Sequence, residues 1–326
     1  MSKPVVYITR EIPKIGLEIL QDYCQVRMNQ KDRSLTKREV IEMAQKADGL
    51  LTMLNNPIDE EVIDSCSDLK VISNYAVGYN NIDVEYATEK GIVVTNTPGV
   101  LTETTADLAW ALLLAVARRI VESDDFTRKG KFDGWYPKLM LGTEVSGKTL
   151  GIIGLGRIGK AVAKRAQGFN MKVVYNNRTP LDKREEDKLD LNHLELDQLL
   201  QTADFVSINA PLNDSTYHLI AGEEFKKMKQ NAIIINTGRG PIIDEVGLVN
   251  ALKTGEIAGA GLDVYEDEPE VQEGLKELNN VVLTPHTGSG TIETREKMAE
   301  MAANNIIAVL KGNKIPNPVN PSLVDK

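Results

Sequence analysis

The chain of 326 residues has few cysteines, few aromatic residues and no surplus of positive charge. Its two cysteines, Cys24 and Cys66, lie far apart, which predicts neither a disulfide framework nor a zinc site. A formal net charge of −9 disfavours non-specific binding to nucleic acid or to an anionic membrane, because both need a basic protein surface. We therefore expect no metal site, no nucleic-acid partner and two reduced, buried thiols in a cytoplasmic protein.

Long apolar runs are also missing from the sequence. The most apolar run, Leu108 to Ala117, is about half the roughly 20 residues that span a bilayer, so it predicts a buried helix and no membrane association. The composition, 42% hydrophobic and 26% charged, is that of an ordinary globular protein. Because single cores rarely grow beyond roughly 250–300 residues, the length predicts two domains.

Short apolar runs alternate with helical patterns, which predicts an α/β fold with parallel sheets covered by helices. The predicted strands are 4–9, 48–52, 70–74, 91–95, 149–153, 172–176, 204–208, 231–236, 258–263 and 280–284. A turn-prone stretch near 96–99 separates the first four strands from the other six. The helical tail from Glu293 to Leu310 has no strand to join, so we expect it to pack on the first domain. The predicted domains are 1–99 with 288–326, and 100–287.

A glycine loop between the predicted strand 149–153 and a predicted helix, Lys160 to Gly168, is the clearest motif. Its residues are Gly154, Leu155, Gly156, Arg157, Ile158 and Gly159. In this context Gly154 permits a tight turn, Gly156 lets the backbone approach a pyrophosphate, and Gly159 lets the helix pack on the strand. Free N–H groups at the start of the helix would receive the anion, so the loop indicates dinucleotide binding.

The next predicted strand ends in Asn176, Asn177, Arg178 and Thr179. An acid about 20 residues after the loop would bind the ribose 2′-hydroxyl of NAD, whereas an arginine suits the 2′-phosphate of NADP. Asn176 avoids charge repulsion, Arg178 offers a bidentate fork and Thr179 offers a hydroxyl. The cofactor is therefore predicted to be NADPH or NADP, with NADH or NAD as second choice. The alternative is a solvated Arg178 paired with Glu185 or Glu186.

Three polar residues follow predicted strands in the second half: Arg239, Glu268 and His286. Ligands of open α/β sheets bind at the carboxyl ends of strands. This set suits the reduction of a 2-oxo acid, in which arginine fixes the carboxylate and polarises the carbonyl. Histidine delivers a proton as hydride arrives, and glutamate holds the imidazole. On spacing alone, structural roles fit equally well. His193, in a polar connection, and His218 are expected to be surface or loop residues.

The chain resembles the D-isomer-specific 2-hydroxyacid dehydrogenases over essentially its full length. Besides the strand and glycine loop of 149–159, the matching segments are 77–83 (VGYNNID), 236–240 (NTGRG), 260–265 (AGLDVY) with 268–269 (EP), and 284–289 (TPHTGS). In that family the arginine of the R-G pair, the glutamate before the E-P proline and the histidine of T-P-H are catalytic. They correspond to Arg239, Glu268 and His286.

Within the family the chain is most similar to glyoxylate/hydroxypyruvate reductases, on segments 104–109, 134–137, 141–142 and 178–179. The resemblance implies reduction of glyoxylate to glycolate, or of hydroxypyruvate to D-glycerate, by a cytoplasmic homodimer. It also implies two doubly wound parallel-sheet domains with an active-site cleft between them. One is a Rossmann-type NAD(P)-binding domain, with a dimerisation helix and arm at about 101–147, and the other is a flavodoxin-like substrate-binding domain. The helix over 102–119 would form much of the dimer interface.

The resemblance also assigns residues to ligands. For the substrate, Val77 and Gly78 would offer backbone N–H groups to the carboxylate. The other substrate-binding residues would be Leu54, Asn55, Ser289 and, from the arm of a partner subunit, Trp135, whose alternative is interface packing. For the cofactor, the further residues would be Thr105, Ala210, Pro211, Thr237, Gly238, Asp263 and Gly288. Asp263 would hold the nicotinamide amide, or else cap a helix or form a salt bridge, and Thr105 would approach the nicotinamide or be an ordinary helix residue.

Other activities fit the sequence less well. A 3-phosphoglycerate dehydrogenase typically carries an acid where this chain has Asn176, and many append a regulatory domain. A 2-ketogluconate reductase stays an open alternative, because the size of the substrate pocket depends on side-chain orientations that the sequence does not give. A dinucleotide-sensing corepressor or scaffold could retain catalytic residues, but its consumption of NADPH with glyoxylate would be absent or trivial.

Overall fold

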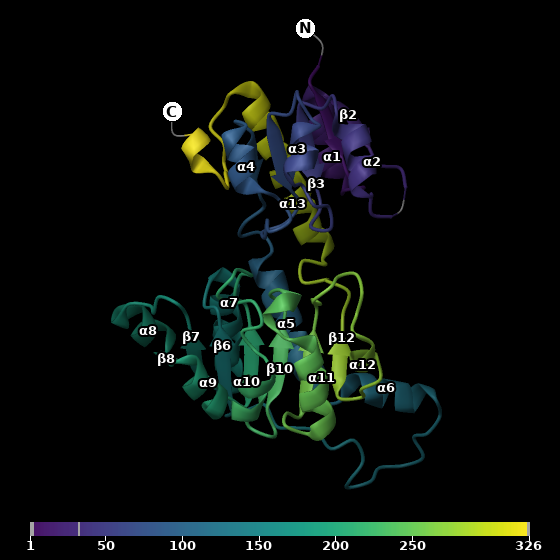
Figure 1. Ribbon diagram of the computed structural model, residues 1–326. Coiled ribbons are helices and arrows are strands. Elements are labelled where there is room, and N and C mark those ends of the chain that lie inside the picture. Colours follow the sequence, from purple (N-terminus) through teal and green to yellow (C-terminus); the bar gives the residue numbers. More distant parts are fainter. Residues whose placement is uncertain (1–2, 32, 325–326) are drawn as a thin grey trace. The chain divides into compact units, whose positions relative to one another are not determined.

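The computed structural model describes residues 3–31 and 33–324, and the chain forms two compact units (Figure 1). Unit 1 comprises Met1–Leu101 and Ser289–Lys326, and unit 2 comprises Thr102–Gly288. Each unit is an α/β fold built on a parallel sheet, as the sequence predicts. None of the described helices combines the length and the apolar character that a membrane crossing requires.

The sheet of unit 1 has the strand order β2-β1-β3-β4-β5, which is the flavodoxin-like order. Its strands are β1 (Val5–Ile8), β2 (Gln25–Met28), β3 (Gly49–Thr52), β4 (Val71–Asn74) and β5 (Val93–Thr95). Every residue of β3 and β4 is buried, including the polar Thr52, Ser73 and Asn74 at their carboxyl ends. Strand β2 was not predicted, because this edge strand exposes alternate residues and its sequence resembles that of a polar connection.

The helices of unit 1 cover this sheet. They are α1 (Lys14–Tyr23), α2 (Lys37–Ala44), α3 (Glu60–Asp64), α4 (Val84–Glu89), α13 (Ile292–Lys311) and the short 3₁₀ helix η3 (Pro321–Leu323). Helix α13 comes after all of unit 2 in the sequence, yet it packs against α1, β3 and β4. The two helices approach closely at Gly16, where a Cβ atom would lie 2.8 Å from the carbonyl oxygen of Ala299.

The sheet of unit 2 has the order β12-β11-β10-β9-β6-β7-β8. Counted from β6, this is the Rossmann order 3-2-1-4-5-6 with one more strand at the end. The strands are β6 (Thr149–Ile153), β7 (Lys172–Asn176), β8 (Leu191–His193), β9 (Phe205–Ile208), β10 (Ile233–Asn236), β11 (Gly259–Leu262) and β12 (Val281–Leu283). The short edge strand β8 has no apolar run by which it could have been predicted. His193, expected in a polar connection, therefore ends a strand.

Helices cover both faces of this sheet. They are α5 (Thr102–Ala117), α6 (Ile120–Arg128), α7 (Arg157–Ala166), α8 (Lys183–Leu189), α9 (Leu196–Thr202), α10 (Gly222–Lys227), α11 (Glu245–Thr254) and α12 (Glu273–Lys276), with 3₁₀ turns η1 (Gln167–Phe169) and η2 (Gly240–Ile242). Ile233 and Ile235 join the core cluster of α5 and α7, whereas Ile234 joins that of α9, α10 and α11. Alternate residues of β10 thus face opposite layers, and this is why its first three residues are all isoleucine.

The helix α5 is buried on one face. Ala109, Trp110, Leu112 and Leu113 lie in the core of unit 2, whereas Leu114, Ala115 and Val116 are only partly buried. Its expected part in a dimer interface stays a prediction. Six of the large apolar side chains that are exposed among the described residues lie on the segment after α5, from Ile120 to Leu141, and the others are scattered over both units.

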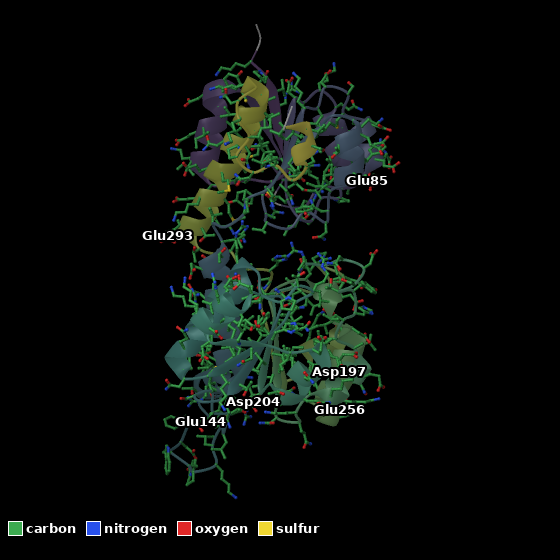
Figure 2. All side chains as sticks on the ribbon, turned by 90° about the vertical axis from the view of Figure 1, so that its left-hand side faces the viewer. Glu85, Glu144, Asp197, Asp204, Glu256 and Glu293 are labelled. Carbon is green, nitrogen blue, oxygen red and sulfur yellow. The ribbon has the colours of Figure 1, made fainter. Side chains whose placement is uncertain are left out.

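Asp204, labelled in Figure 2, joins the starts of β6 and β9. Its carboxylate accepts hydrogen bonds from the backbone N–H of Thr149 and from Nζ of Lys229, each at 2.9 Å. Burial opposes its ionisation, but these two donors outweigh burial and hold the pKa of Asp204 below its usual value. The strands it joins flank the point where the strand order reverses, and their far ends carry the glycine loop.

Candidate active site

The glycine loop joins β6 to α7, and two of its glycines are required by close backbone contacts. Gly154 has a φ of +89°, and a Cβ atom there would lie 2.5 Å from the backbone nitrogen of Ala210 after β9. A Cβ atom on Gly159 would lie 2.3 Å from the carbonyl oxygen of Gly154. A Cβ atom on Gly156, by contrast, would have no neighbouring atom within 4 Å, so the space beside this residue is open. The loop is therefore closed toward the protein and open where a pyrophosphate would approach.

Free backbone N–H groups lie next to this open space, at the start of α7. Helix α7 begins at Arg157, and the N–H groups of Gly156, Arg157 and Ile158 have no hydrogen-bond partner among the described residues. The N–H of Leu155, by contrast, donates a hydrogen bond to Oδ1 of Asn177 at 2.8 Å. The first turn of the helix thus offers free donors and a positive dipole end, which is the chemistry that binds a phosphate.

Four residues at the end of β7 were predicted to bind the cofactor. Within the described part of the chain, two of them have hydrogen-bond partners and two do not. Asn176 donates from Nδ2 to the carbonyl of Leu194 at 2.9 Å, and Asn177 holds the glycine loop, so both carboxamides have structural partners. Arg178 and Thr179 are exposed, and neither side chain has a partner among the described residues.

The alternative pairing of Arg178 does not occur in the structure. Glu185 forms an ion pair with Lys160, and Glu186 accepts a hydrogen bond from the hydroxyl of Tyr175 at 2.9 Å. The guanidinium of Arg178 therefore remains available to a ligand.

The predicted residues on neighbouring strands surround the loop. Gly238, after β10, lies beside Ala210, because a Cβ atom on Gly238 would be 3.1 Å from the Ala210 carbonyl oxygen. Thr237 carries a buried hydroxyl without a hydrogen-bond partner among the described residues. Pro211 is exposed next to Ala210. An orphaned hydroxyl beside an open glycine loop fits a polar ligand, so the residues present suit a dinucleotide.

Arg239 follows β10 in a turn fixed by Asn236. The Asn236 side chain accepts from the N–H of Gly238 at 3.0 Å and donates to the carbonyl of Arg239 at 2.9 Å. The half-buried Arg239 donates from Nη1 to the Gly238 carbonyl at 2.8 Å. Desolvation lowers the pKa of Arg239, and the charge of Glu268 partly offsets this effect. Arg239 and Glu268 therefore interact electrostatically.

Glu268 and His286 form a hydrogen-bonded pair. Oε2 of Glu268 lies 2.8 Å from Nδ1 of His286, and Oε1 accepts the N–H of Tyr265 at 3.1 Å. Burial opposes ionisation of Glu268, but His286, Tyr265 and Arg239 together hold its pKa below the usual value, so it is a carboxylate at neutral pH. Because a carboxylate only accepts, the pair places a hydrogen on Nδ1 and leaves Nε2 of His286 as the outward nitrogen.

The loop that carries His286 is fixed by Asp263, which is buried after β11. Asp263 accepts from the Thr284 hydroxyl at 2.6 Å and from the N–H groups of Thr287 and Gly288, each at 2.7 Å. Its own carbonyl accepts the N–H of His286 at 2.9 Å. Both carboxylate oxygens are thus engaged in orienting this loop, a function that the sequence analysis did not assign to Asp263.

Thr105 of α5 lies in the same neighbourhood. A Cβ atom on Gly288 would be 3.3 Å from both Thr105 Cγ2 and Asp263 Oδ2. The structure thus brings together three residues that were predicted to bind the cofactor: Thr105 and Asp263, both expected at the nicotinamide, and Gly288.

A second histidine–carboxylate pair was missed. His218, expected to be an ordinary surface or loop residue, lies with Nε2 2.6 Å from Oε1 of Glu266. Glu266 also accepts the N–H of Glu245 at 3.3 Å, and Glu245 accepts the N–H of Glu266 at 2.9 Å. No pattern connects residues 48 positions apart, so the sequence contained no signal for this pair.

The remaining predicted residues belong to unit 1 or to the arm after α6. In unit 1, Val77 and Gly78 follow β4, Leu54 and Asn55 follow β3, and Asn55 donates to the hydroxyl of Ser34. The carbonyl of Ser289 accepts from Nε of Arg295 at 3.2 Å. Trp135, in unit 2, is 81% exposed.

Taken together, the fold and the site of unit 2 define a dinucleotide-dependent oxidoreductase. The family model of the D-isomer specific 2-hydroxyacid dehydrogenase NAD-binding domain matches residues 110–288. The chain belongs to the D-isomer specific 2-hydroxyacid dehydrogenase family. It is an NAD(P)-dependent dehydrogenase that reduces a 2-oxo acid.

Full-length relatives support this assignment. The glyoxylate reductase of Thermococcus litoralis is 49% identical over 326 residues, which is 99% of this chain and 98% of that protein. The TT0316 protein of Thermus thermophilus has a TM-score of 0.90 at 46% identity, covering 97% of this chain and 99% of that one. An NADPH-dependent glyoxylate/hydroxypyruvate reductase of Sinorhizobium meliloti, solved with NADP and malonate, has a TM-score of 0.88 at 31% identity, covering 100% and 99%.

Proposed function

We propose that the protein is a glyoxylate reductase that prefers NADPH, reducing glyoxylate to glycolate and hydroxypyruvate to D-glycerate. The observation that carries the proposal is the Glu268–His286 pair beside the charge of Arg239, on loops that follow neighbouring strands. The names of similar full-length proteins support glyoxylate as the substrate. The two free, buried cysteines are consistent with a cytoplasmic site of action, which we also propose.

Each of the three proposed catalytic residues would have one role in the reaction. Arg239 binds the substrate carboxylate and polarises the carbonyl through its guanidinium. When bound, the reduced nicotinamide would supply the hydride that adds to the carbonyl carbon. His286 gives the proton on Nε2 to the carbonyl oxygen, and Glu268 keeps the imidazole oriented through Nδ1. Hydride and proton together convert the ketone or aldehyde to an alcohol.

The cofactor would be held mainly by backbone donors of the glycine loop. The free N–H groups of Gly156, Arg157 and Ile158 would bind the pyrophosphate. Arg178 and Thr179 would bind the 2′-phosphate that distinguishes NADPH from NADH. The other proposed contacts are with Gly154, Leu155, Gly159, Asn176, Asn177, Ala210, Pro211, Thr237, Gly238, Asp263, Gly288 and Thr105. For the substrate, we propose the backbone of Val77 and Gly78, with Leu54, Asn55 and Ser289 lining the pocket.

Steady-state rates with a panel of 2-oxo acids test the proposed function. The panel contains glyoxylate, hydroxypyruvate, 2-ketogluconate and 3-phosphohydroxypyruvate, each with NADPH and with NADH. We expect the highest kcat/KM for glyoxylate or hydroxypyruvate with NADPH. Negligible consumption of NADPH with glyoxylate would instead favour another 2-oxo acid or a dinucleotide-sensing role.

Replacing Arg178 with alanine is expected to raise the KM for NADPH roughly 10- to 100-fold and to leave that for NADH almost unchanged. The reason is that a charge-assisted hydrogen bond to phosphate contributes about 1.5–3 kcal/mol, and NADH lacks this phosphate. Arg184→Ala is a matched control, because Arg184 is also exposed and lies on α8 close by in sequence. Equal effects of Arg178→Ala on both cofactors would disprove the phosphate assignment.

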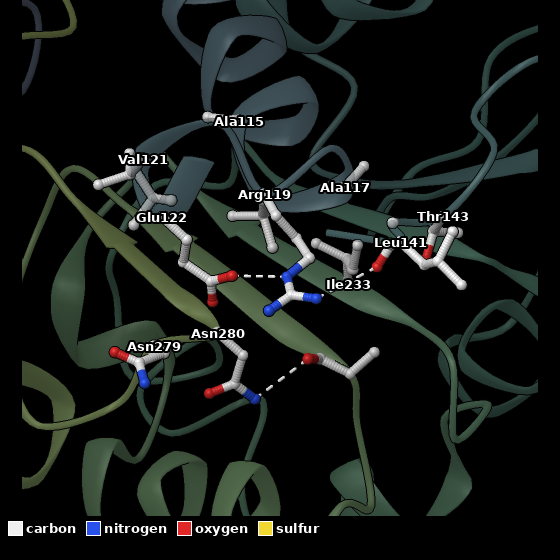
Figure 3. Close-up of a pocket in the computed structure, with 14 residues that line it drawn as sticks. Ala115, Ala117, Arg119, Val121, Glu122, Leu141, Thr143, Ile233, Asn279 and Asn280 are labelled. Carbon is white, nitrogen blue, oxygen red and sulfur yellow. Dashed lines mark hydrogen bonds and ion pairs between the residues drawn. The ribbon is translucent and has the colours of Figure 1, made fainter. Parts of the chain in front are cut away.

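We also propose that the protein is a homodimer that associates through α6 and the arm that follows it. The exposed apolar side chains here are Ile120, Val121, Phe132, Trp135, Tyr136 and Leu141. Beside them lies a pocket of about 400 Å³ at the amino ends of β10, β11 and β12 (Figure 3). It contains none of the proposed catalytic residues, so we interpret it as part of an interface. Trp135 would reach the partner's active site.

Val121→Glu is expected to convert the dimer into a monomer, because a carboxylate in an apolar interface loses its hydration without gaining a partner. Light scattering coupled to size-exclusion chromatography measures the change. Val246→Glu is the control, since Val246 is 67% exposed on α11, away from the arm, and Val121 is 55% exposed. A Val121→Glu protein with the mass of the wild type would place the interface elsewhere.

A further inference from the structure

The loop that follows β4 in unit 1 has an unusual distribution of hydrogen bonds. The four carbonyl groups of residues 76–79 all accept hydrogen bonds: that of Ala76 accepts from the N–H of Thr97 at 2.8 Å, and that of Tyr79 from the N–H of Ile82 at 3.0 Å. The carbonyls of Val77 and Gly78 accept from side chains, each at 2.7 Å. The N–H groups of Val77, Gly78 and Tyr79 have no partner among the described residues.

Two asparagines hold the carbonyls of Val77 and Gly78. Asn96, directly after β5, donates from Nδ2 to the carbonyl of Val77. Its own carbonyl accepts from Nδ2 of Asn305 on α13 at 3.0 Å. Asn74, the fully buried last residue of β4, donates from Nδ2 to the carbonyl of Gly78. The loop is therefore fixed from two rigid elements.

Asn74 is itself held in place by Asn81. The Nδ2 of Asn74 donates to Oδ1 of Asn81 at 3.0 Å, and the Nδ2 of Asn81 donates back to Oδ1 of Asn74 at 3.3 Å. Asn81 also donates to the carbonyls of Met53 and Asn56, each at 3.1 Å. The donor that holds Gly78 thus has little freedom to move.

The hydrogen bonds to these carbonyls also determine the direction in which the N–H groups of the loop point. In a planar trans peptide the carbonyl of one residue and the N–H of the next point in opposite directions. When Asn96 holds the Val77 carbonyl, it therefore turns the N–H of Gly78 away from itself. Asn74 does the same, through the Gly78 carbonyl, for the N–H of Tyr79. The result is a set of free donors directed away from the asparagines, as an anion receptor requires.

We propose that Asn96 and Asn74 are positioning residues, which preorganise the N–H groups of Gly78 and Tyr79 in the Val77–Tyr79 loop to bind the substrate carboxylate. This inference rests on the proposed function, in which the same loop binds that carboxylate. Neither asparagine touches the substrate. They remove the need for the loop to reorganise on binding, which would otherwise weaken affinity.

The test uses malonate as a simple carboxylate probe, titrated calorimetrically into the full-length protein saturated with NADPH. Asn96→Ala is expected to raise the Kd of malonate and the KM of glyoxylate roughly three- to tenfold, the equivalent of one hydrogen bond. The kcat should stay within about threefold, because the carboxylate is held equally in ground and transition states. The Kd of NADPH and the melting temperature should match those of the control.

Thr97→Val is the matched control. Thr97 is a fully buried neighbour of Asn96, and its hydroxyl has no partner among the described residues, so the change preserves shape and removes no bond of the loop. Asn96→Leu, which keeps the branched shape of the side chain but has no donor, is measured in its place if Asn96→Ala fails to fold.

Two results would overturn the inference: wild-type protein that binds no malonate, or a folded Asn96 variant that binds malonate as tightly as Thr97→Val does. Failure of the proposed function looks different. In that case the wild type binds malonate, the Asn96 variants bind it more weakly, and NADPH is still not consumed with glyoxylate.

Discussion

His286→Ala is expected to lower the kcat for reduction of glyoxylate by roughly 10²–10⁴-fold, the usual contribution of a general acid. The imidazole is oriented by Glu268 at Nδ1, with a separation of 2.8 Å, and the His286 side chain is 32% exposed, so Nε2 is accessible to a substrate. Loss of the ring removes the proton donor but leaves the glycine loop intact. The Kd of NADPH, measured by fluorescence titration, should therefore be unchanged.

His218→Ala is the matched control for this experiment. His218 is also a histidine paired with a glutamate, Glu266, at 2.6 Å, and its side chain is 31% exposed. It lies on the loop before α10, and we expect its removal to change kcat by less than about fivefold, since no general acid is lost. If His218→Ala were the variant with the large loss, the proton donor would have been assigned to the wrong histidine.

Arg239→Ala is expected to lower kcat/KM for glyoxylate by roughly 10²–10³-fold, because truncating one partner of a close charge pair costs several kcal/mol. The effect should depend on the substrate carboxylate. For a carbonyl compound without a carboxylate, such as acetaldehyde, the wild type and the variant should differ far less.

Arg239→Lys separates charge from geometry. Lysine keeps the positive charge but loses the planar fork that binds a carboxylate in a bidentate manner, so we expect an intermediate kcat/KM. An equal loss for glyoxylate and acetaldehyde in Arg239→Ala would contradict the assignment, since Arg239 would then act on something other than the carboxylate.

Local sequence patterns were sufficient to predict most of the strands. The run Ile233–Ile235 in β10 is apolar because the strand is buried on both faces, and burial of this kind leaves a continuous hydrophobic sequence. The two edge strands, Gln25–Met28 and Leu191–His193, were missed for the opposite reason. They are short and partly exposed, so their residues carry no apolar run.

Some residues of the candidate site could be predicted from the sequence with their roles, and others could not. The glycine loop could be read directly, because close backbone contacts at Gly154 and Gly159 exclude every larger residue. Arg239, Glu268 and His286 were placed at strand ends by pattern and given roles by resemblance. The engagement of Asp263 with the His286 loop could not be seen, since an aspartate after a strand suits many roles equally well.

The sequence by itself determined the family, the alternation of strands and helices and the phosphate-binding loop, because each of these is written in residues that are neighbours along the chain. Only the tertiary structure decided which polar side chains pair: His218 with Glu266, Asn96 with the Val77 carbonyl, and Asn177 with the glycine loop. These partners are separated by many residues and meet only when the strands lie side by side. A hydrogen bond depends on the distance and direction between two atoms in space, and no periodicity of the sequence encodes either.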